Sequence, residues 1–302
     1  MSSVETVDHR KIAAIEPDVT YSPRSGDWLV YAPSGARSNP LVLLRQSLSN
    51  FWSTRELAWI LFTRDLKSQV RRSFLGYAWL FSGPIMTAAM WVFLRSQAVV
   101  SIDTKIPYPL FVLSGTILWG LLRAGFDATV DVYSSDILKK LNVPIEAFIA
   151  RNLANVAFQF LLAGIPLSCL FVLYQYRLPA TVLLFPFAVV GLVLTGAAAG
   201  CFLAPLASLY GDIGRMTHIV FMGLMYLSPV IYPLRETGWL GTLMHWNPLT
   251  PLLNVCRELL FGGDAQPLLP AVIMVIFAAG MLSVGLILLH VARPHIIARK
   301  GM

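Results

Sequence analysis

The sequence has few charged residues and few cysteines. Asp, Glu, Lys and Arg make up 13% of its 302 residues, whereas about a quarter is typical of a soluble domain. Together with a hydrophobic content of 56%, this composition excludes an ordinary soluble domain and a disordered chain. Three cysteines in so long a chain do not make a secreted disulfide scaffold, so we expect them to pack as apolar side chains.

Signatures of nucleotide and metal chemistry are also missing. No Gly-x-x-x-x-Gly-Lys-Ser/Thr phosphate loop occurs, and none of the six lysines lies in a glycine-rich turn, so we predict that the chain does not hydrolyse ATP itself. The five histidines do not fall at metal-ligand spacings with acidic or thiol partners. No pair of nucleophile and general base is evident, and we expect no catalytic residue, metal or cofactor on this chain.

Long charge-free runs dominate the sequence. A helix needs about 20 apolar residues to cross a hydrocarbon layer of about 30 Å. Such runs cover residues 73–94, 152–176, 178–211, 216–234 and 266–292. The run 106–122 is a sixth if its helix continues through Arg123 towards Tyr133. The sequence therefore predicts an all-α integral membrane protein with six transmembrane helices, in which 178–211 forms one tilted helix.

The two ends of the chain are more polar. Residues 1–50 have no apolar run long enough for a signal-peptide core, so we expect a cytoplasmic N-terminal tail there. Residues 51–72 begin with the capping-box spacing of Ser53 to Glu56 and continue with apolar residues at helical intervals among charges. They predict an amphipathic helix on the inner membrane face, with a cytosolic packing helix as the alternative. Residues 293–302 are expected to be a cytoplasmic C-terminal tail.

Residues 233–263 are apolar but broken by prolines and glycines into two pieces of about ten residues, each too short to cross a membrane. Irregular backbone at membrane depth must be buried in protein or face water. We therefore predict a re-entrant or outer-face helical hairpin between spans five and six, and a surface loop is the alternative.

Basic residues are distributed unevenly between the two sides of the predicted membrane. With the N-terminus inside, 17 Lys and Arg residues lie on the inner side and five on the outer side, while Arg123 falls within a span. This distribution predicts that both termini are cytoplasmic. The formal net charge of +7 thus reflects topology, and we expect no nucleic-acid partner.

Several short motifs follow one another along the chain. They are Arg64-Asp65-Leu66-Lys67, Leu75-Gly76, Tyr108-Pro109-Leu110-Phe111, Ile137-Leu138-Lys139-Lys140, Asp212-Ile213-Gly214, Leu227-Ser228-Pro229-Val230-Ile231-Tyr232-Pro233 and Asn247-Pro248-Leu249-Thr250-Pro251. With the predicted topology, this order resembles the permease subunit of type-2 ABC exporters, in the branch that exports O-antigen, capsule or teichoic-acid polymers. The resemblance covers about residues 50–295.

The resemblance implies a permease domain at 73–292 that works as a homodimer in the bacterial inner membrane. It also implies two copies of a separate nucleotide-binding ATPase subunit, which bind the ATP and magnesium, and a lipid-linked polysaccharide as substrate. Export of a small amphiphile or drug, or of a lipo-oligosaccharide, is the alternative within this superfamily. An ion-coupled secondary transporter and a membrane enzyme of glycan synthesis are alternatives outside it.

The resemblance also assigns about residues 134–145 as a coupling helix that docks on the ATPase. The residues concerned are Ser135, Asp136, Leu138, Lys139, Lys140, Asn142 and Pro144. Locally, Asp136 can begin a short helix, the two lysines suit its last turn, and Pro144 prevents its continuation. A plain connecting loop is the alternative.

Charges within the second span form a second candidate site. Arg123, Asp127 and Asp131 are spaced i, i+4, i+8 and lie along one helix face. Such charges must face protein or water in a membrane. We favour an Arg123 to Asp127 ion pair or a hydrophilic cavity lining over proton coupling.

The remaining candidates concern the substrate path. Arg71 and Arg72 lie at headgroup depth, where they suit a lipid phosphate, and simple positive-inside anchoring is equally compatible. Flat aromatic rings let a sugar polymer slide, and the channel candidates are Tyr77, Trp79, Trp91 and Trp119. The outer-gate candidates, within 233–263 and just before it, are Tyr232, Trp239 and Trp246. Small residues between Gly191 and Gly200 predict a close helix approach.

Overall fold

The computed structural model describes residues 40–70, 79–97, 104, 106–134, 144–234, 237–263 and 268–300. Every regular element in these ranges is a helix, so the all-α prediction is confirmed for them. The elements are α1 (Pro40–Ser53), α2 (Arg55–Val70), α3 (Trp79–Ser96), α4 (Tyr108–Val130), η4 (Val132–Ser134), α6 (Ile145–Leu173), η5 (Ala180–Leu184), α7 (Phe185–Leu209), α8 (Asp212–Tyr226), α9 (Gly238–Trp246), α10 (Leu249–Phe261) and α11 (Leu268–Lys300).

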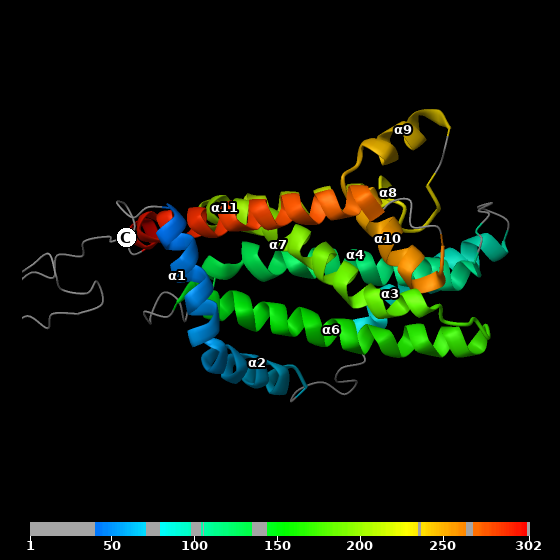
Figure 1. Ribbon diagram of the computed structural model, residues 1–302, viewed down its shortest axis with the longest axis horizontal. Helices are drawn as coiled ribbons and strands as arrows, with labels where there is room; N and C mark the ends of the chain where they lie inside the picture. Colours follow the sequence, from blue (N-terminus) through cyan, green and yellow to red (C-terminus); the bar gives the residue numbers. More distant parts are fainter. Residues whose placement is uncertain are drawn as a thin grey trace, which may run out of the picture.

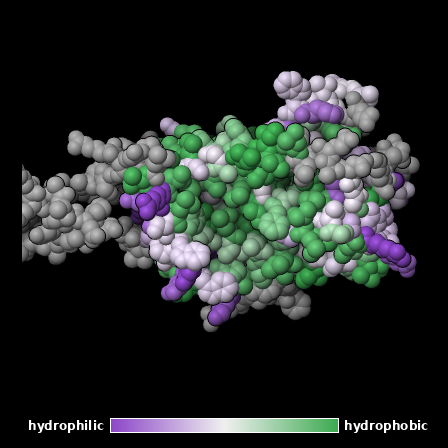
Figure 2. All heavy atoms as spheres, in the orientation of Figure 1, coloured by the Kyte–Doolittle hydropathy of each residue, from purple (hydrophilic) through white to green (hydrophobic). Residues whose placement is uncertain are grey.

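The long helices α4, α6, α7 and α11 run side by side along the long axis of the molecule (Figure 1). Helix α1 crosses one end of this bundle, near the C-terminal end of α11, and α9 and α10 lie towards the opposite end (Figure 1). We call these the inner end and the outer end. Hydrophobic residues cover the middle of the visible face, and hydrophilic residues gather towards its two ends (Figure 2). This pattern is typical of a membrane-embedded bundle.

Among the described residues, four helical segments are long and apolar enough to span a membrane: Tyr108–Val130, Ile145–Leu173, Ala180–Leu209 and Val272–Arg293. The second span does continue through Arg123, as expected, and ends at Val130. The run 178–211 contains the single helix α7 after the short 3-10 helix η5, so the prediction of one helix without an internal turn is confirmed. Over their described residues, helices α3 and α8 are not among the helices that are long and apolar enough to span a membrane.

Several helix boundaries differ from the prediction. Helix α8 ends at Tyr226 instead of continuing to 234, because the chain turns at 227–230 and Pro229 cannot donate the main-chain hydrogen bond that a helix needs. Helix α6 begins at Ile145, directly after Pro144, and not at 152. Helix α11 continues to Lys300, past the predicted end at 292.

The last part of the predicted N-terminal tail is helical, since α1 covers Pro40–Ser53 and includes residue 50. Ser53 does not cap α2: its Oγ donates to the carbonyl of Asn50 at 3.2 Å. The Thr54 amide donates to the same carbonyl at 2.9 Å, so helical hydrogen bonding runs almost without interruption from α1 into α2. An N-cap needs non-helical backbone that is absent at this point.

Helices α4 and α7 form the centre of the bundle, and glycines permit their close contact. A Cβ atom on Gly125 would collide with the main chain at Val193, and one on Gly196 would collide with the carbonyl of Leu122. Ala197 and Ala198 are buried beside Gly196. The small residues therefore bring two backbones together, as the sequence predicts.

A second, smaller group of buried apolar residues lies at the inner end and joins five elements. This inner-end cluster consists of Leu61, Val132, Tyr133, Ile145, Phe148, Ile149, Cys201, Ala204, Leu286, Leu289 and Ile296. Cys201 and Cys256 are buried as apolar side chains, whereas Cys169 is exposed, so the prediction for the cysteines is confirmed for two of the three.

Candidate functional site

Helix α4 is buried on almost all sides, and its remaining open stripe carries charged side chains. Beyond its start, the stripe consists of Gly120, Arg123, Ala124 and Asp127, and Asp131 continues it just after the helix ends. Arg123 Nε lies 2.9 Å from Asp127 Oδ1 and 3.0 Å from Asp127 Oδ2. The side chains of Arg123 and Asp127 are 25% and 43% exposed. The spacing thus predicts the ion pair correctly, and an apolar bundle presents a charged surface here.

The charged stripe borders an aromatic cluster. The Arg123 guanidinium lies 4.6 Å from the ring centroid of Phe221 on α8. Phe221 also contacts Phe126 at 4.9 Å and Trp119 at 5.9 Å between centroids. Cations bind the faces of such rings, so Arg123 interacts with both α4 and α8. At the inner end of the stripe, desolvation and then the nearby Asp127 carboxylate raise the pKa of Asp131, while Arg123 lowers it.

Polar groups of α6 face α4 near the same end. Asn152 Nδ2 donates to the carbonyl of Ala128 at 2.7 Å, and Arg151 pairs with Asp65 of α2 at 3.0 Å. Further out, Gln159 lines a small cavity between α3, α4 and α6 together with Gly120. Asn152 and Gln159 thus place two polar side chains of α6 beside α4, whereas Arg151 points to α2.

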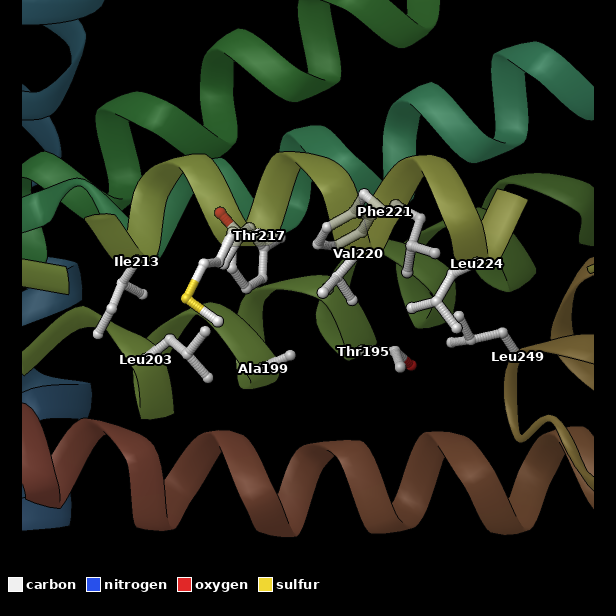
Figure 3. Close-up of a pocket in the computed structure, with 13 residues that line it drawn as sticks. Thr195, Ala199, Leu203, Ile213, Thr217, Val220, Phe221, Leu224 and Leu249 are labelled. Atoms are coloured by element: carbon white, nitrogen blue, oxygen red, sulfur yellow. The ribbon is translucent and has the colours of Figure 1, made fainter. Parts of the chain in front are cut away.

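An apolar cleft lies on the other side of Phe221, between α7 and α8 (Figure 3). Its volume is about 380 Å³, and its lining includes Leu203 of α7 and Ile213 and Val220 of α8. Its two hydroxyl groups bond within their own helices: Thr195 Oγ1 donates to Gly191 and Thr217 Oγ1 to Gly214, each at 2.9 Å. The cleft therefore offers apolar contacts only.

At the outer end, two of the sequence motifs meet. Asn247 Nδ2 donates to Ser228 Oγ at 2.8 Å and to the carbonyl of Leu227 at 3.2 Å. Asn247 Oδ1 accepts from the amide of Leu249 at 3.0 Å. The predicted pair of short helices is confirmed as α9 and α10, which are separated at Asn247 and Pro248.

Arg257 of α10 is a buried cation that the sequence reasoning missed, because it was counted among the basic residues of the outer side. Its guanidinium donates to the carbonyls of Pro229 and Val230. It also lies 3.8 Å from the ring centroid of Phe111 on α4. A Cβ at Gly115 would collide with both Val230 and Arg257, so this glycine makes room for the contact. The signal in the sequence was a lone arginine within an apolar helix.

The other predicted site residues fall into four groups. Those outside the described residues are Arg71, Arg72, Tyr77, Ser135, Asp136, Leu138, Lys139, Lys140 and Asn142. Trp91 and Tyr232 are half-buried against the core, and Trp119 is buried. Trp239 and Trp246 on α9 are 77% and 83% exposed. Pro144 is the N-cap residue of α6, and Trp79 is the first residue of α3.

Comparison with known proteins identifies the architecture. An O-antigen export system permease protein RfbA from Klebsiella pneumoniae is 23% identical, over 69% of this chain and 81% of that protein. The protein of the same name from Myxococcus xanthus is 26% identical, over 68% of this chain and 82% of that protein. Residues 56–261, from α2 to the end of α10, match the family described as ABC-2 type transporter. The chain, whose described residues form a helical bundle with a charged stripe on α4, belongs to the ABC-2 type transporter family.

Proposed function

We propose that this chain is the permease subunit of an ATP-driven exporter that moves lipid-linked polysaccharide across the bacterial inner membrane. The observation that carries the proposal is the family match over residues 56–261, supported by the two O-antigen export permeases among its relatives. A small amphiphile is the second candidate cargo, because the cleft between α7 and α8 offers an apolar lining.

In this proposal α3 and α8 complete a set of six spans. Helix α8 rises about 22 Å over its 15 residues, so the turns after Tyr226 occupy the remaining depth. Irregular backbone at that depth requires protein partners. The burial of Val230 and Ile231, and the hydrogen bonds from Arg257 to this turn, support such a placement.

The inner end of the bundle is proposed to face the cytoplasm. Helix α1 and the C-terminal end of α11 share this end (Figure 1), and the uneven distribution of Lys and Arg assigns the same side to both termini. The exposed α9 then lies on the outer face, where Trp239 and Trp246 are available to a gate.

We further propose that two copies of the chain face each other across the α4 stripe. Charged side chains within a span need water or protein next to them, and Arg123 and Asp127 are both open in the single chain. A hydrophilic path between two copies supplies that environment. Arg123 and Asp127 neutralise each other's charge. This pairing favours a wall of a path for a bulky sugar polymer over a site of proton coupling.

Two copies of an ATPase subunit, with ATP and magnesium bound to it, are proposed to dock on about residues 134–145. Lys139 and Lys140 supply cations for this contact, and Arg71 and Arg72 supply cations for a lipid phosphate. These roles derive from the family to which the chain belongs.

The test is to purify the tagged full-length chain in mild detergent together with the products of its neighbouring genes. We expect an ATPase subunit to co-elute, and we expect the charge reversal of Lys139→Glu with Lys140→Glu to reduce its binding or its activity at least several-fold. Glu56→Lys, a charge reversal on the exposed face of α2, serves as the control.

Export by membrane vesicles distinguishes the alternatives. Uptake of the lipid-linked polysaccharide into inverted vesicles should require ATP and continue when a protonophore removes the proton gradient. Transport that follows the proton gradient without ATP, from a chain that elutes with no ATPase, would contradict the proposal and direct attention to Asp127 and Asp131.

A further inference from the structure

The two flanks of the proposed coupling segment are both attached to one turn of α11. Before the segment, Tyr133 of η4 donates a hydrogen bond from its hydroxyl to the carbonyl of Leu289. After the segment, Glu146 Oε1 in the first turn of α6 lies 3.1 Å from Nε2 of His290. The attachment points are consecutive residues of α11.

The Glu146 carboxylate is the centre of this junction. Its side chain is 1% exposed, and it also accepts a hydrogen bond from Asn50 Nδ2 of α1 at 3.0 Å. On the other side of the imidazole, Nδ1 of His290 lies 2.9 Å from the carbonyl of Leu286. Three helices therefore meet at one buried carboxylate, and separating any of them would leave a charged group without its partners.

Apolar packing holds the same parts together. Val132 and Tyr133 before the segment, and Ile145 after it, belong to the inner-end cluster with Leu286 and Leu289. Close-packed interiors of this kind transmit displacement instead of absorbing it. Helix α11 in turn packs against α7, and α7 packs against α4.

We propose that Tyr133 and Glu146 are positioning residues that fix both flanks of the coupling segment to the turn 286–290 of α11. Nucleotide-driven displacement of the segment is thereby delivered to α11 and, through Asn50, to α1. The inference depends on the proposed function only in assigning the ATPase contact to residues 134–145. Its structural part, the attachment of both flanks to α11, is independent of the cargo.

The experiment compares hydrogen exchange in the complete complex of this chain with its ATPase, reconstituted in lipid nanodiscs, without nucleotide and after trapping with ATP and vanadate. The peptides of interest cover residues 284–296 of α11. The variants are Tyr133→Phe, which removes one hydroxyl group, and Glu146→Gln, which removes one charge and keeps the shape. Tyr174→Phe and Glu56→Gln are matched controls at exposed positions.

In the wild type and both controls we expect vanadate trapping to change exchange in these α11 peptides. In Tyr133→Phe and Glu146→Gln we expect at least half of that change to be lost while the complex stays assembled and its ATPase rate remains within about two-fold. A purely structural role would raise exchange equally in both nucleotide states and leave their difference intact, which would overturn the inference. A wild-type chain that assembles with no ATPase contradicts the proposed function instead.

Discussion

The two ends of the bundle bury charge in different ways. At the outer end, the guanidinium of Arg257 is held by main-chain carbonyls 27 and 28 residues away in the sequence and by the ring of Phe111. At the inner end, the carboxylate of Glu146 is held by side chains, one of them from Asn50, 96 residues away. Carbonyl oxygens and an aromatic ring do not titrate, whereas His290 and Glu146 both do.

This difference indicates different tasks. The outer site links a turn to two helices through one guanidinium, whose acceptors are main-chain carbonyls instead of a second charged residue. The inner site depends on a pair of ionisable groups from separate helices, so its strength responds to changes in either partner. The following predictions compare how much each site, and the open charges of α4, contribute to the free energy of unfolding.

Arg257→Met should have the largest effect on stability. The substitution fills part of the space but leaves the carbonyls of Pro229 and Val230 buried without a donor, and we expect a loss of about 4 kcal/mol in the free energy of unfolding. Thermal unfolding of the purified chain in detergent measures it. Arg177→Met, at an exposed position on the outer side, should have almost no effect. A similar melting temperature for both variants would show that the contacts of Arg257 do not stabilise the outer end.

His290→Ala should cost somewhat less, about 3 kcal/mol, because among the described residues it leaves Glu146 buried with only Asn50 as a side-chain partner. The His290 side chain is 20% exposed, so water can replace part of the lost interaction. The double variant with Glu146→Gln should recover most of the loss, since it removes the unpaired charge. Additive losses in the double variant would argue against a direct interaction between the two residues.

Asp127→Asn tests an ion pair that is partly exposed instead of buried. The pair with Arg123 is partly exposed in the single chain, and Arg123 keeps its contact with Phe221, so we expect a loss of about 1 kcal/mol. Asp212→Asn breaks the Arg215 pair on α8, whose side chains are both more than four-fifths exposed, and should change the melting temperature less. A loss for Asp127→Asn as large as that for His290→Ala would mean that the α4 stripe is buried in the assembled protein.

Asp131→Asn should have the smallest effect, within about 0.5 kcal/mol near neutral pH. The pKa of Asp131 is raised from 3.8 by desolvation and by Asp127, so the folded chain binds its proton more tightly than the unfolded chain does. Its contribution to stability therefore decreases as the pH rises through this window. The difference in melting temperature between wild type and Asp131→Asn, followed from about pH 4 to about pH 7, should shift in favour of the variant. An unchanged difference would show that Asp131 is not perturbed in the folded protein.

Much of the fold follows from simple patterns in the sequence. Charge-free runs locate α4, α6, α7 and α11, because only a helix satisfies its own backbone hydrogen bonds in an apolar environment. Boundaries are less predictable: α8 ends before the Ser228-Pro229 turn, and the sequence pattern of α1 does not distinguish it from a tail. Its signal was weak, since α1 is short and its burial depends on the distant contact of Ser47 and Asn50 with α6 and α11.

The contacts of the candidate site were predictable only between residues that are close together in the sequence. Arg123 and Asp127 are one helical turn apart, so their spacing reveals the pair. The buried position of Arg257 could not be predicted, because its hydrogen-bond acceptors are main-chain carbonyls, which have no sequence signature. The junction of Glu146 with His290 joins residues from opposite halves of the chain. No pattern within one helix reports such a contact.

The glycine contact between α4 and α7 also offers a practical reference for spectroscopy. Because Gly125 and Gly196 bring backbone directly against backbone, the two helices have no intervening side chains at these two positions that could repack to change their separation. Labels attached to the outer ends of α4 and α7 should therefore report a constant distance throughout a transport cycle. That distance can serve as an internal ruler against which movements of α8 and α11 are measured in the same sample.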